Sequence, residues 1–194
     1  MTTVDADAAR PEPGPPEAAG PGRVPTTDPW ARAAGLVRAA QCDDALALND
    51  LLDLLTPYVS RLCRPIALSH TADAVQESLI AVFQGLPRLK EPESLYAWVR
   101  TITVREAMRV AKRTSRETPV SDFRDLPGTW STELEADVRD VLRRLPPEHR
   151  AVLVLRELEG LDERSASILL NISQGTVKSR LHRARKNFRK AWKR

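Results

Sequence analysis

The sequence predicts an all-α protein that consists of two small helical domains joined by a flexible linker. Apolar residues recur at steps of three and four residues in several stretches, which is the spacing of one helix face. No segment alternates β-branched residues with turn residues, so we expect no sheet. The chain has 194 residues, of which 42% are hydrophobic. Because about 29 residues are expected outside any core, this content suits two small cores rather than one large one.

The first 29 residues are predicted to form a disordered tail. They include seven Pro and three Gly but few apolar side chains, so burial cannot offset the entropy lost on ordering. The sequence shows no basic start followed by an apolar run and no stretch of membrane-spanning length. We therefore expect a cytoplasmic protein without membrane contact. Two cysteines, Cys42 and Cys63, are too few for a disulfide framework and are expected to be reduced.

The first domain is predicted to span residues 30–114, and one of its helices begins near Thr71. One face of this helix is apolar and carries Val75, Leu79, Val82, Phe83 and Leu86. The opposite face carries Asp73, Glu77, Ile80 and Gln84, with Gln76 beside them. An Ile among polar residues fits either an ordinary solvated face or a contact surface, and the periodicity leaves both interpretations open.

A second helix of this domain is predicted to open at Ser94, after Pro92, and to run toward Arg113. Its shared apolar face consists of Leu95, Trp98, Val99 and Ile102. Residues 115–132 then form the predicted linker, because the chain becomes polar, contains Pro and Gly and shows no sustained period. The linker has two large side chains, Phe123 and Trp130, whose simplest role is loose docking against a domain.

The second domain is predicted to span residues 133–194 and to contain four helices. The first carries Val138, Val141, Leu142 and Leu145 and stops at the pair Pro146 and Pro147. Pro147 opens the next helix, in which Val152, Leu155 and Leu158 are spaced for burial and which Gly160 ends. Asp162 is a candidate cap for a short helix through Leu170, and residues 171–173 form a turn.

The last helix has the pattern of a DNA-reading helix. Its buried stripe is predicted to be Val177, Leu181, Ala184 and Phe188, and its outward side Thr176, Ser179, Arg183, Lys186 and Lys190. Ser173 is placed to cap its first turn. Between Arg164 and Arg194 there are ten Lys or Arg residues and no acidic residue, although the net charge of the chain is only +4. A short helix, a tight turn and a basic helix form a helix-turn-helix arrangement.

Three stretches of the second domain read LPPEHR at 145–150, LRELEG at 155–160 and GTVKSRLHRARK at 175–186. In this order they resemble region four of the extracytoplasmic-function (ECF) sigma factors of bacterial RNA polymerase. The resemblance implies that the last helix reads the minus-thirty-five promoter element in the major groove. Contacts to bases or to the sugar-phosphate backbone are expected from Thr176, Lys178, Ser179, Arg180, His182, Arg183, Lys186 and Lys190. Residues 161–167 lack the aromatic and acidic pair that is usual in this family.

The first domain resembles region two of the same family. DAVQE at 73–77 is similar to the segment that grips the clamp coiled coil of the polymerase's largest subunit, which implies polymerase contacts from Asp73, Gln76, Glu77 and Ile80. WVRTI at 98–102 is similar to the segment that enters the minus-ten element, with residues 87–93 in place of the base-capturing loop. Minus-ten contacts are therefore expected from Trp98, Arg100, Arg105, Arg109, Lys112 and Arg113, although core packing is the favoured role of Trp98.

One departure from the family concerns Arg105 and Arg109, which stand where relatives usually carry an Asn and an Asp. Either these arginines make additional backbone contacts with DNA, or the helix is adjusted to keep two charges away from the core. The resemblance further implies that the linker passes toward the RNA exit channel. It also implies partners, namely core RNA polymerase, through its clamp coiled coil and flap, and promoter DNA. Anti-sigma factors are common partners in the family, and the sequence leaves open whether one exists here.

The predicted function is thus that of a sigma factor, without catalysis, cofactor or metal. One alternative is a stand-alone helix-turn-helix regulator that binds a palindromic operator as a dimer. The other is an enzyme with a metal site at His70, Asp73 and Glu77, whose spacings of three and four could gather ligands on one helix face. The sequence contains neither a Gly-rich phosphate loop nor a nucleophile elbow.

Overall fold

The computed structural model describes residues 29–117 and 133–193. The predicted tail, apart from residue 29, and residues 118–132 of the predicted linker, with Phe123 and Trp130, lie outside the described residues. Residues 115–117 of the predicted linker belong instead to the last turn of the helix before it. The described residues form helices and no strand, which confirms the predicted all-α class. The helices are α1 (Pro29–Gln41), α2 (Ala45–Ala67), α3 (Thr71–Gly85), α4 (Leu95–Glu117), α5 (Glu133–Arg143), α6 (Pro147–Leu153), α7 (Glu163–Leu170) and α8 (Gln174–Trp192). Short 3₁₀ turns occupy Leu68–His70, Leu86–Arg88 and Pro92–Ser94.

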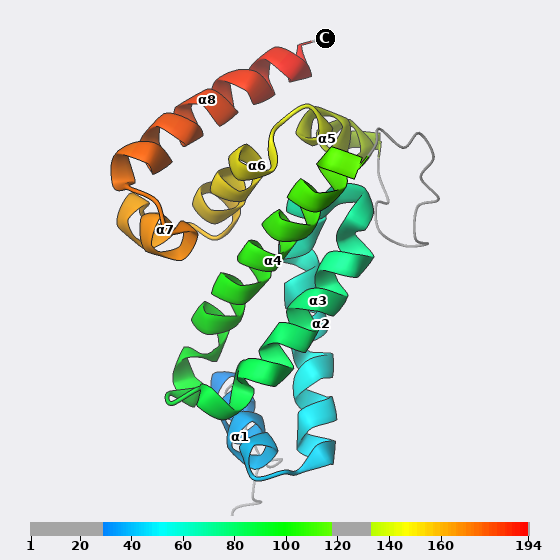
Figure 1. Cartoon of the computed structure of the whole chain (residues 1–194), viewed down its shortest axis with the longest axis vertical. Coiled ribbons are helices and arrows are strands. Elements are labelled where there is room, and N and C mark those ends of the chain that lie inside the picture. The colour runs from blue at the N-terminus through cyan, green and yellow to red at the C-terminus, as the bar shows by residue number, and fades with distance from the viewer. Residues whose placement is uncertain (1–28, 118–132, 194) are drawn as a thin grey trace, which may run out of the picture.

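Helices α1 to α4 form an N-terminal body, residues 29–117, in which α2, α3 and α4 pack side by side and α1 crosses one end (Figure 1). Asp44 caps α2 by accepting hydrogen bonds from the backbone amides of Leu46 and Ala47. The buried stripe of α2 consists of Leu51, Leu55, Val59, Leu62 and Ile66. Cys63 is buried on this helix, and burial raises the pKa of its thiol to about 12, whereas Cys42 is exposed.

The buried face of α3 is centred about one residue away from the predicted one. Ala74, Ser78 and Val82 point into the core at four-residue spacing, and the Ser78 hydroxyl donates to the Ala74 carbonyl oxygen, 2.6 Å away. Phe83 is therefore turned outward and is 52% exposed, so the prediction that it is buried is wrong. One residue corresponds to about 100° around a helix, which is enough to move a side chain from core to surface.

The segment between α3 and α4 is held from the side of α1. Gln41 donates from Nε2 to the carbonyl oxygens of Leu86 and Leu89, both 2.8 Å away. Arg38 pairs with Glu93 at the other end of the segment. These contacts connect α1 directly to the segment that corresponds to the predicted base-capturing loop.

Helices α5 to α8 form a C-terminal body, residues 133–193. The predicted caps are confirmed: Asp162 accepts from the Ser165 amide at 2.7 Å, and Ser173 accepts from the Thr176 amide at 3.1 Å. Gly160 ends the preceding segment with a φ of 64°, which glycine adopts without strain. Leu158, predicted to be buried, is 55% exposed, because the chain widens into a π-helical turn over Val154–Leu158 that shifts the helix face.

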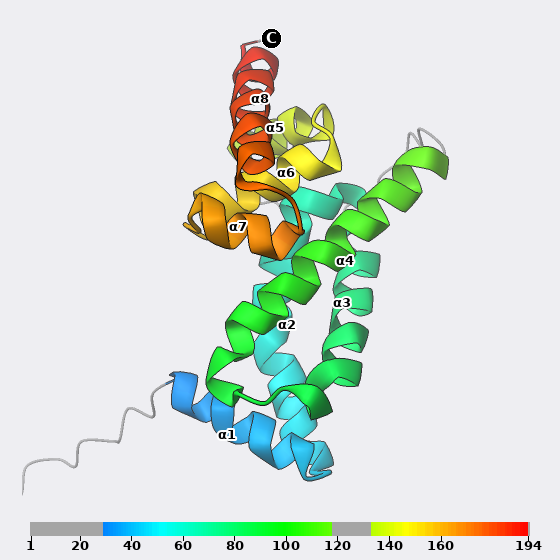
Figure 2. The same ribbon diagram turned by 60° about the vertical axis from the view of Figure 1, so that its left-hand side comes forward.

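The two bodies pack directly against each other (Figure 2). Helix α6 lies against α2 and α4, α7 lies against α4, and the buried apolar residues of both bodies form one continuous cluster. Arg150 of α6 is 6% exposed and donates from Nε to the carbonyl oxygen of Ile66, at the end of α2, 2.8 Å away. The sequence did not predict this packing between the bodies.

Candidate DNA-binding and polymerase-binding surfaces

Helix α8 presents a polar and basic side to solvent. Its buried residues are Val177, Leu181 and Ala184, three of the four predicted for the stripe, while Phe188 is half-buried. Six of the eight predicted minus-thirty-five residues are exposed, and these are Lys178, Ser179, His182, Arg183, Lys186 and Lys190. Thr176 and Arg180 are half-buried. A straight helix with one anchored face and one free basic face has the shape and charge that fit a major groove.

The hydrogen bonds of the first turn of α8 fix its polar side chains. The hydroxyls of Ser173 and Thr176 lie 2.8 Å apart, and the Ser179 hydroxyl donates to the Thr176 carbonyl oxygen at 3.1 Å. Arg185, which is itself exposed, pairs with Glu157 at 2.7 Å, and this pair ties α8 to the π-helical turn before α7. Arg185 is not among the eight residues predicted to contact the minus-thirty-five element.

Three cations of α4 contact the C-terminal body, although Arg105 and Lys112 also remain exposed to solvent. Arg100 lies 3.4 Å from a carboxylate oxygen of Glu159, and Lys112 lies 2.8 Å from a carboxylate oxygen of Glu148. Arg105 donates from Nε to the Leu169 carbonyl oxygen, 2.9 Å away, near the C-terminal end of α7. Arg105, one of the two departures from the family pattern, therefore contacts the other body in this structure.

Glu159 is the most enclosed acidic group of this contact. Its side chain is 6% exposed and accepts from Arg61 at 2.7 Å and from the Tyr58 hydroxyl at 3.1 Å, in addition to its pairing with Arg100. Burial and the neighbouring Glu159 charge raise the pKa of Tyr58 to about 12, so its hydroxyl stays protonated and donates. A buried carboxylate with several donors is a well-satisfied anion.

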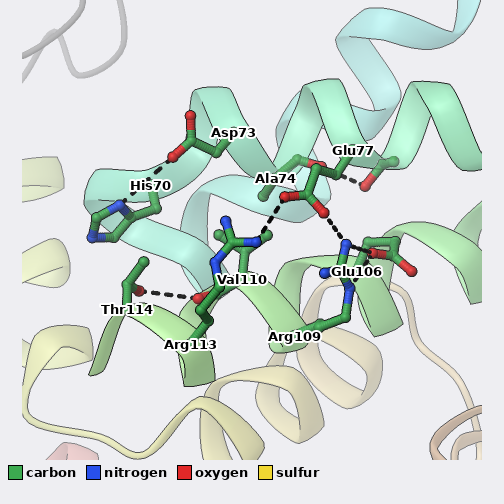
Figure 3. Close-up of polar contacts among 10 residues, drawn as sticks. His70, Asp73, Ala74, Glu77, Glu106, Arg109, Val110, Arg113 and Thr114 are labelled. Carbon is green, nitrogen blue, oxygen red and sulfur yellow. Dashed lines mark hydrogen bonds and ion pairs between the residues drawn. The ribbon is translucent and has the colours of Figure 1, made fainter. Parts of the chain in front are cut away.

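The other two α4 cations of the predicted minus-ten set, Arg109 and Arg113, lie against α3 (Figure 3). Arg113 is 3.2 Å from a carboxylate oxygen of Glu77, and Arg109 pairs with the other oxygen of the same carboxylate. Arg109 also donates from Nε to Glu106 at 2.7 Å. Glu77, a predicted polymerase contact, is thus used within the N-terminal body.

Trp98 is half-buried, and its ring lies on Gly85, where a Cβ would come within 2.8 Å of the indole. This position fits the favoured core role. On the outer face of α3, Asp73 and Gln76 are exposed and Ile80 is 45% exposed. Phe83, which the sequence reasoning assigned to the core, lies one turn beyond Ile80 and adds a second apolar side chain to this face.

Two residues of the alternative metal site pair with each other, and the third pairs elsewhere. His70 Nδ1 lies 3.8 Å from a carboxylate oxygen of Asp73, while Glu77 is taken by the two arginines of α4 (Figure 3). Within residues 29–117 and 133–193, no group of three His, Cys, Asp or Glu side chains is arranged to hold a metal ion. None of the helices in the described part of the chain combines the length and the apolar character that crossing a bilayer requires.

Comparison with known proteins matches the two bodies to two known regions. Residues 48–117 match Sigma-70 region 2, and residues 135–188 match Sigma-70, region 4. An ECF RNA polymerase sigma-E factor of Haemophilus influenzae is 31% identical over 155 residues, which cover 71% of this chain and 78% of that protein. The chain belongs to the ECF sigma factor family. The predicted family is thereby confirmed, and this sigma factor acts in promoter-directed transcription initiation.

Other relatives agree with this assignment. The ECF RNA polymerase sigma-E factor of Escherichia coli is 27% identical over 169 residues, which cover 77% of this sigma factor and 88% of the relative. The structure of the sigma factor RpoE in complex with the anti-sigma factor NepR from Bartonella quintana has a TM-score of 0.59 at 22% identity, covering 75% of this chain and 96% of that one. CnrH in complex with the cytosolic domain of CnrY gives a TM-score of 0.55 at 20% identity, covering 81% and 94%. These two structures share the fold.

Proposed function

We propose that this sigma factor reads the minus-thirty-five element with α8 and the minus-ten element with α4 and the segment before it. We further propose that it binds core polymerase with the outer face of α3. The observation that carries the proposal is the exposed polar side of α8, which is anchored by Val177, Leu181 and Ala184 on its opposite side. Arg183 and Lys186 on that side are the types of residue that contact guanine edges and phosphates. Residues 30–114 and 133–194 are then the two working domains, and residues 115–132 connect them.

The minus-ten assignment rests on the cations of α4. Arg100, Arg105, Arg109, Lys112 and Arg113 supply positive charge along one helix, which suits the backbone of a melted strand. Trp98 supports this surface from below by packing on Gly85. All five cations have intramolecular partners in the structure, so DNA binding requires those partners to be exchanged for phosphates.

The polymerase contact is assigned to Asp73, Gln76, Ile80 and Glu77 on α3, with Phe83 added. An apolar pair that is 45% and 52% exposed, with polar residues around it, is typical of a protein-binding surface. Glu77 contributes to this surface only indirectly, because its carboxylate holds Arg109 and Arg113. The clamp coiled coil is the proposed partner of α3, and the flap is the proposed partner of the C-terminal domain.

An anti-sigma factor is a further proposed partner. A groove of about 1230 Å³ lies between α2 and α5, α6 and α8, and its lining combines Val138, Leu153, Leu158 and Phe188 with arginines such as Arg61 and Arg189. Of the two solved structures named above, one holds an anti-sigma factor and the other the cytosolic domain of CnrY. An amphipathic helix with acidic edges would match this groove.

We assign the protein no catalytic activity, cofactor or metal of its own, and we place its action in the cytoplasm with the polymerase. Run-off transcription with purified core polymerase, with and without this chain, tests the whole proposal on genomic fragments. Start sites preceded by two common sequence elements support it. Unchanged start sites, together with tight binding of the isolated chain to a palindromic duplex, would instead favour the helix-turn-helix regulator.

A further inference from the structure

The contact between the two bodies brings oxygen acceptors of one body to the cations of the other. Glu159 and Glu148 supply carboxylates to Arg100 and Lys112, and the end of α7 supplies the Leu169 carbonyl oxygen to Arg105. The C-terminal end of a helix carries partial negative charge. The three cations therefore meet three anionic or partly anionic oxygens, which is the same class of ligand that a DNA backbone presents.

This contact is enclosed at Glu159, while the Lys112–Glu148 pair lies nearer its edge with side chains 47% and 30% exposed. Isolated exposed ion pairs contribute little to stability, but the Glu159 side chain is 6% exposed and accepts from three donors. Arg150, also 6% exposed, crosses the same boundary to reach Ile66. Around these groups the apolar residues of both bodies form one cluster. Buried polar groups surrounded by a continuous apolar cluster are typical of a specific interface between two domains.

The docked arrangement is incompatible with simultaneous binding of both promoter elements. The two elements are about 25 base pairs apart by their names, which corresponds to roughly 85 Å of duplex at 3.4 Å per base pair. In the structure, α7 of the C-terminal body lies directly on α4 of the N-terminal body (Figure 2). The bodies must therefore separate before α8 and α4 can each reach their element.

We propose that the surface formed by Arg100, Arg105 and Lys112 is a shared site, which two carboxylates and a carbonyl oxygen of the C-terminal body occupy in the free protein and DNA phosphates occupy during initiation. The inference rests on the proposed minus-ten role of α4. The C-terminal body and the melted strand compete for the same cations, so the apparent affinity of the free protein for that strand falls in proportion to the open fraction. Core polymerase and the minus-thirty-five element favour the open form by engaging the bodies separately.

The first test measures binding of a fluorescent single-stranded oligonucleotide, carrying the mapped minus-ten sequence, to the full-length chain by anisotropy. The double variant Glu148→Gln/Glu159→Gln removes both competing carboxylates and leaves the α4 cations in place. It should bind about tenfold more tightly than the unmodified chain. The control Asp137→Asn/Asp140→Asn makes the same charge change at exposed positions of α5 and should raise affinity less than about twofold. Equal gains for the two double variants would overturn the proposal.

A second variant should change strand binding in the direction opposite to the one that its change in net charge alone would predict. Arg61 pairs with Glu159 but belongs to α2 and is outside the proposed DNA surface. Arg61→Gln weakens the hold on Glu159, so it should increase strand binding about two- to threefold although it removes a positive charge. Arg32→Gln on α1 removes a charge at an exposed position and should lower binding slightly. A decrease for Arg61→Gln equal to that for Arg32→Gln would contradict competition.

Separation of the bodies is measured directly by energy transfer between dyes on the exposed Cys42 and on Asn187→Cys of α8, Cys63 being buried. Efficiency should fall on adding core polymerase and in Glu148→Gln/Glu159→Gln, and unchanged efficiency in that variant would refute the shared site. A different result would show that α4 has no minus-ten role at all. In that case Lys112→Gln and Arg100→Gln would leave crosslinking of the assembled polymerase to the minus-ten strand unaltered, independently of the results with the free chain.

Discussion

Arg150 donates from Nε to the carbonyl oxygen of Ile66, 2.8 Å away, and this hydrogen bond joins residues 84 positions apart in the chain. The same guanidinium donates from Nη1 to the Leu145 carbonyl oxygen at 2.8 Å. Burial lowers the pKa of Arg150 to about 10, against the opposing effect of the Glu148 charge, so the side chain remains charged at neutral pH. One buried cation thus satisfies the end of α2 and the turn between α5 and α6.

Replacing Arg150 should destabilise the fold more than a typical surface change. Arg150→Met keeps much of the apolar volume but leaves the Ile66 and Leu145 carbonyl oxygens without their donor, so we expect a loss of about 2–4 kcal/mol in the free energy of unfolding. Urea denaturation followed by circular dichroism measures it. Arg144→Met, at an exposed neighbouring position, should change stability by less than about 0.5 kcal/mol. A loss of similar size in both variants would refute the special role of Arg150.

A pair of glycine substitutions tests the support of Trp98. A Cβ at Gly85 would lie 2.8 Å and 3.3 Å from two atoms of the rigid indole ring, so Gly85→Ala should cost about 1–3 kcal/mol through forced displacement of the ring. A Cβ at Gly35, within α1, would meet no atom within 4 Å, so Gly35→Ala should stabilise by about 0.5–1 kcal/mol. Thermal melting and tryptophan fluorescence measure both. A neutral Gly85→Ala with unaltered fluorescence would contradict this packing.

Local signals in the sequence were sufficient to predict the helix-turn-helix. The caps at Asp162 and Ser173 and the stripe of α8 depend on residues within a few positions of each other. The structure confirms both caps and buries all of the predicted stripe except Phe188, which is half-buried. The faces at Phe83 and Leu158 were assigned wrongly, because the centre of a buried face depends on what packs against it. Helix α2 was not identified, although Leu51, Leu55 and Val59 repeat every four residues. Pro57 and Pro65 lie inside it, and proline is a strong signal against a helix interior.

The contacts between the bodies could not be predicted from the sequence. Glu159 joins Tyr58, Arg61 and Arg100 across separations of 101, 98 and 59 residues, and no periodic pattern connects such positions. Arg105 was expected to reach DNA or to distort its helix, and in the structure it binds a carbonyl oxygen of α7. Charge patterns locate cations on a helix face, but they do not distinguish a phosphate partner from a carboxylate of the same chain.

His149 should make stability depend on pH below neutrality. Partial burial lowers its pKa, the charges of Arg180 and Arg183 lower it further, and the Glu148 charge partly opposes them. The unfolded chain therefore takes up a proton near pH 6.5 while the folded chain does not. The contribution of His149 to the stability of the fold is fully present above this pH and is lost as the pH falls toward the lowered pKa of His149 in the folded protein. Melting temperatures of the protein and of His149→Gln, compared between pH 7.5 and 5.5, should converge at the lower pH. Parallel curves would exclude His149 as the cause.

Two residues on the exposed side of α8 should respond differently to changes in promoter sequence and salt. Arg183→Ala should cost about 1–3 kcal/mol of promoter binding by the assembled polymerase and should relax selectivity at one position of the minus-thirty-five element, because an arginine fork contacts one base edge. Lys190→Ala should weaken all promoters alike and lower the salt slope by roughly one unit, because a lysine near the end of the helix neutralises one phosphate. Transcription from a set of single-base minus-thirty-five variants, at two salt concentrations, separates the two effects. Equal losses at every promoter for Arg183→Ala would show that Arg183 contacts the DNA backbone and not a base. A loss for Lys190→Ala that depends on the promoter sequence would show that Lys190 contacts a base and not a phosphate.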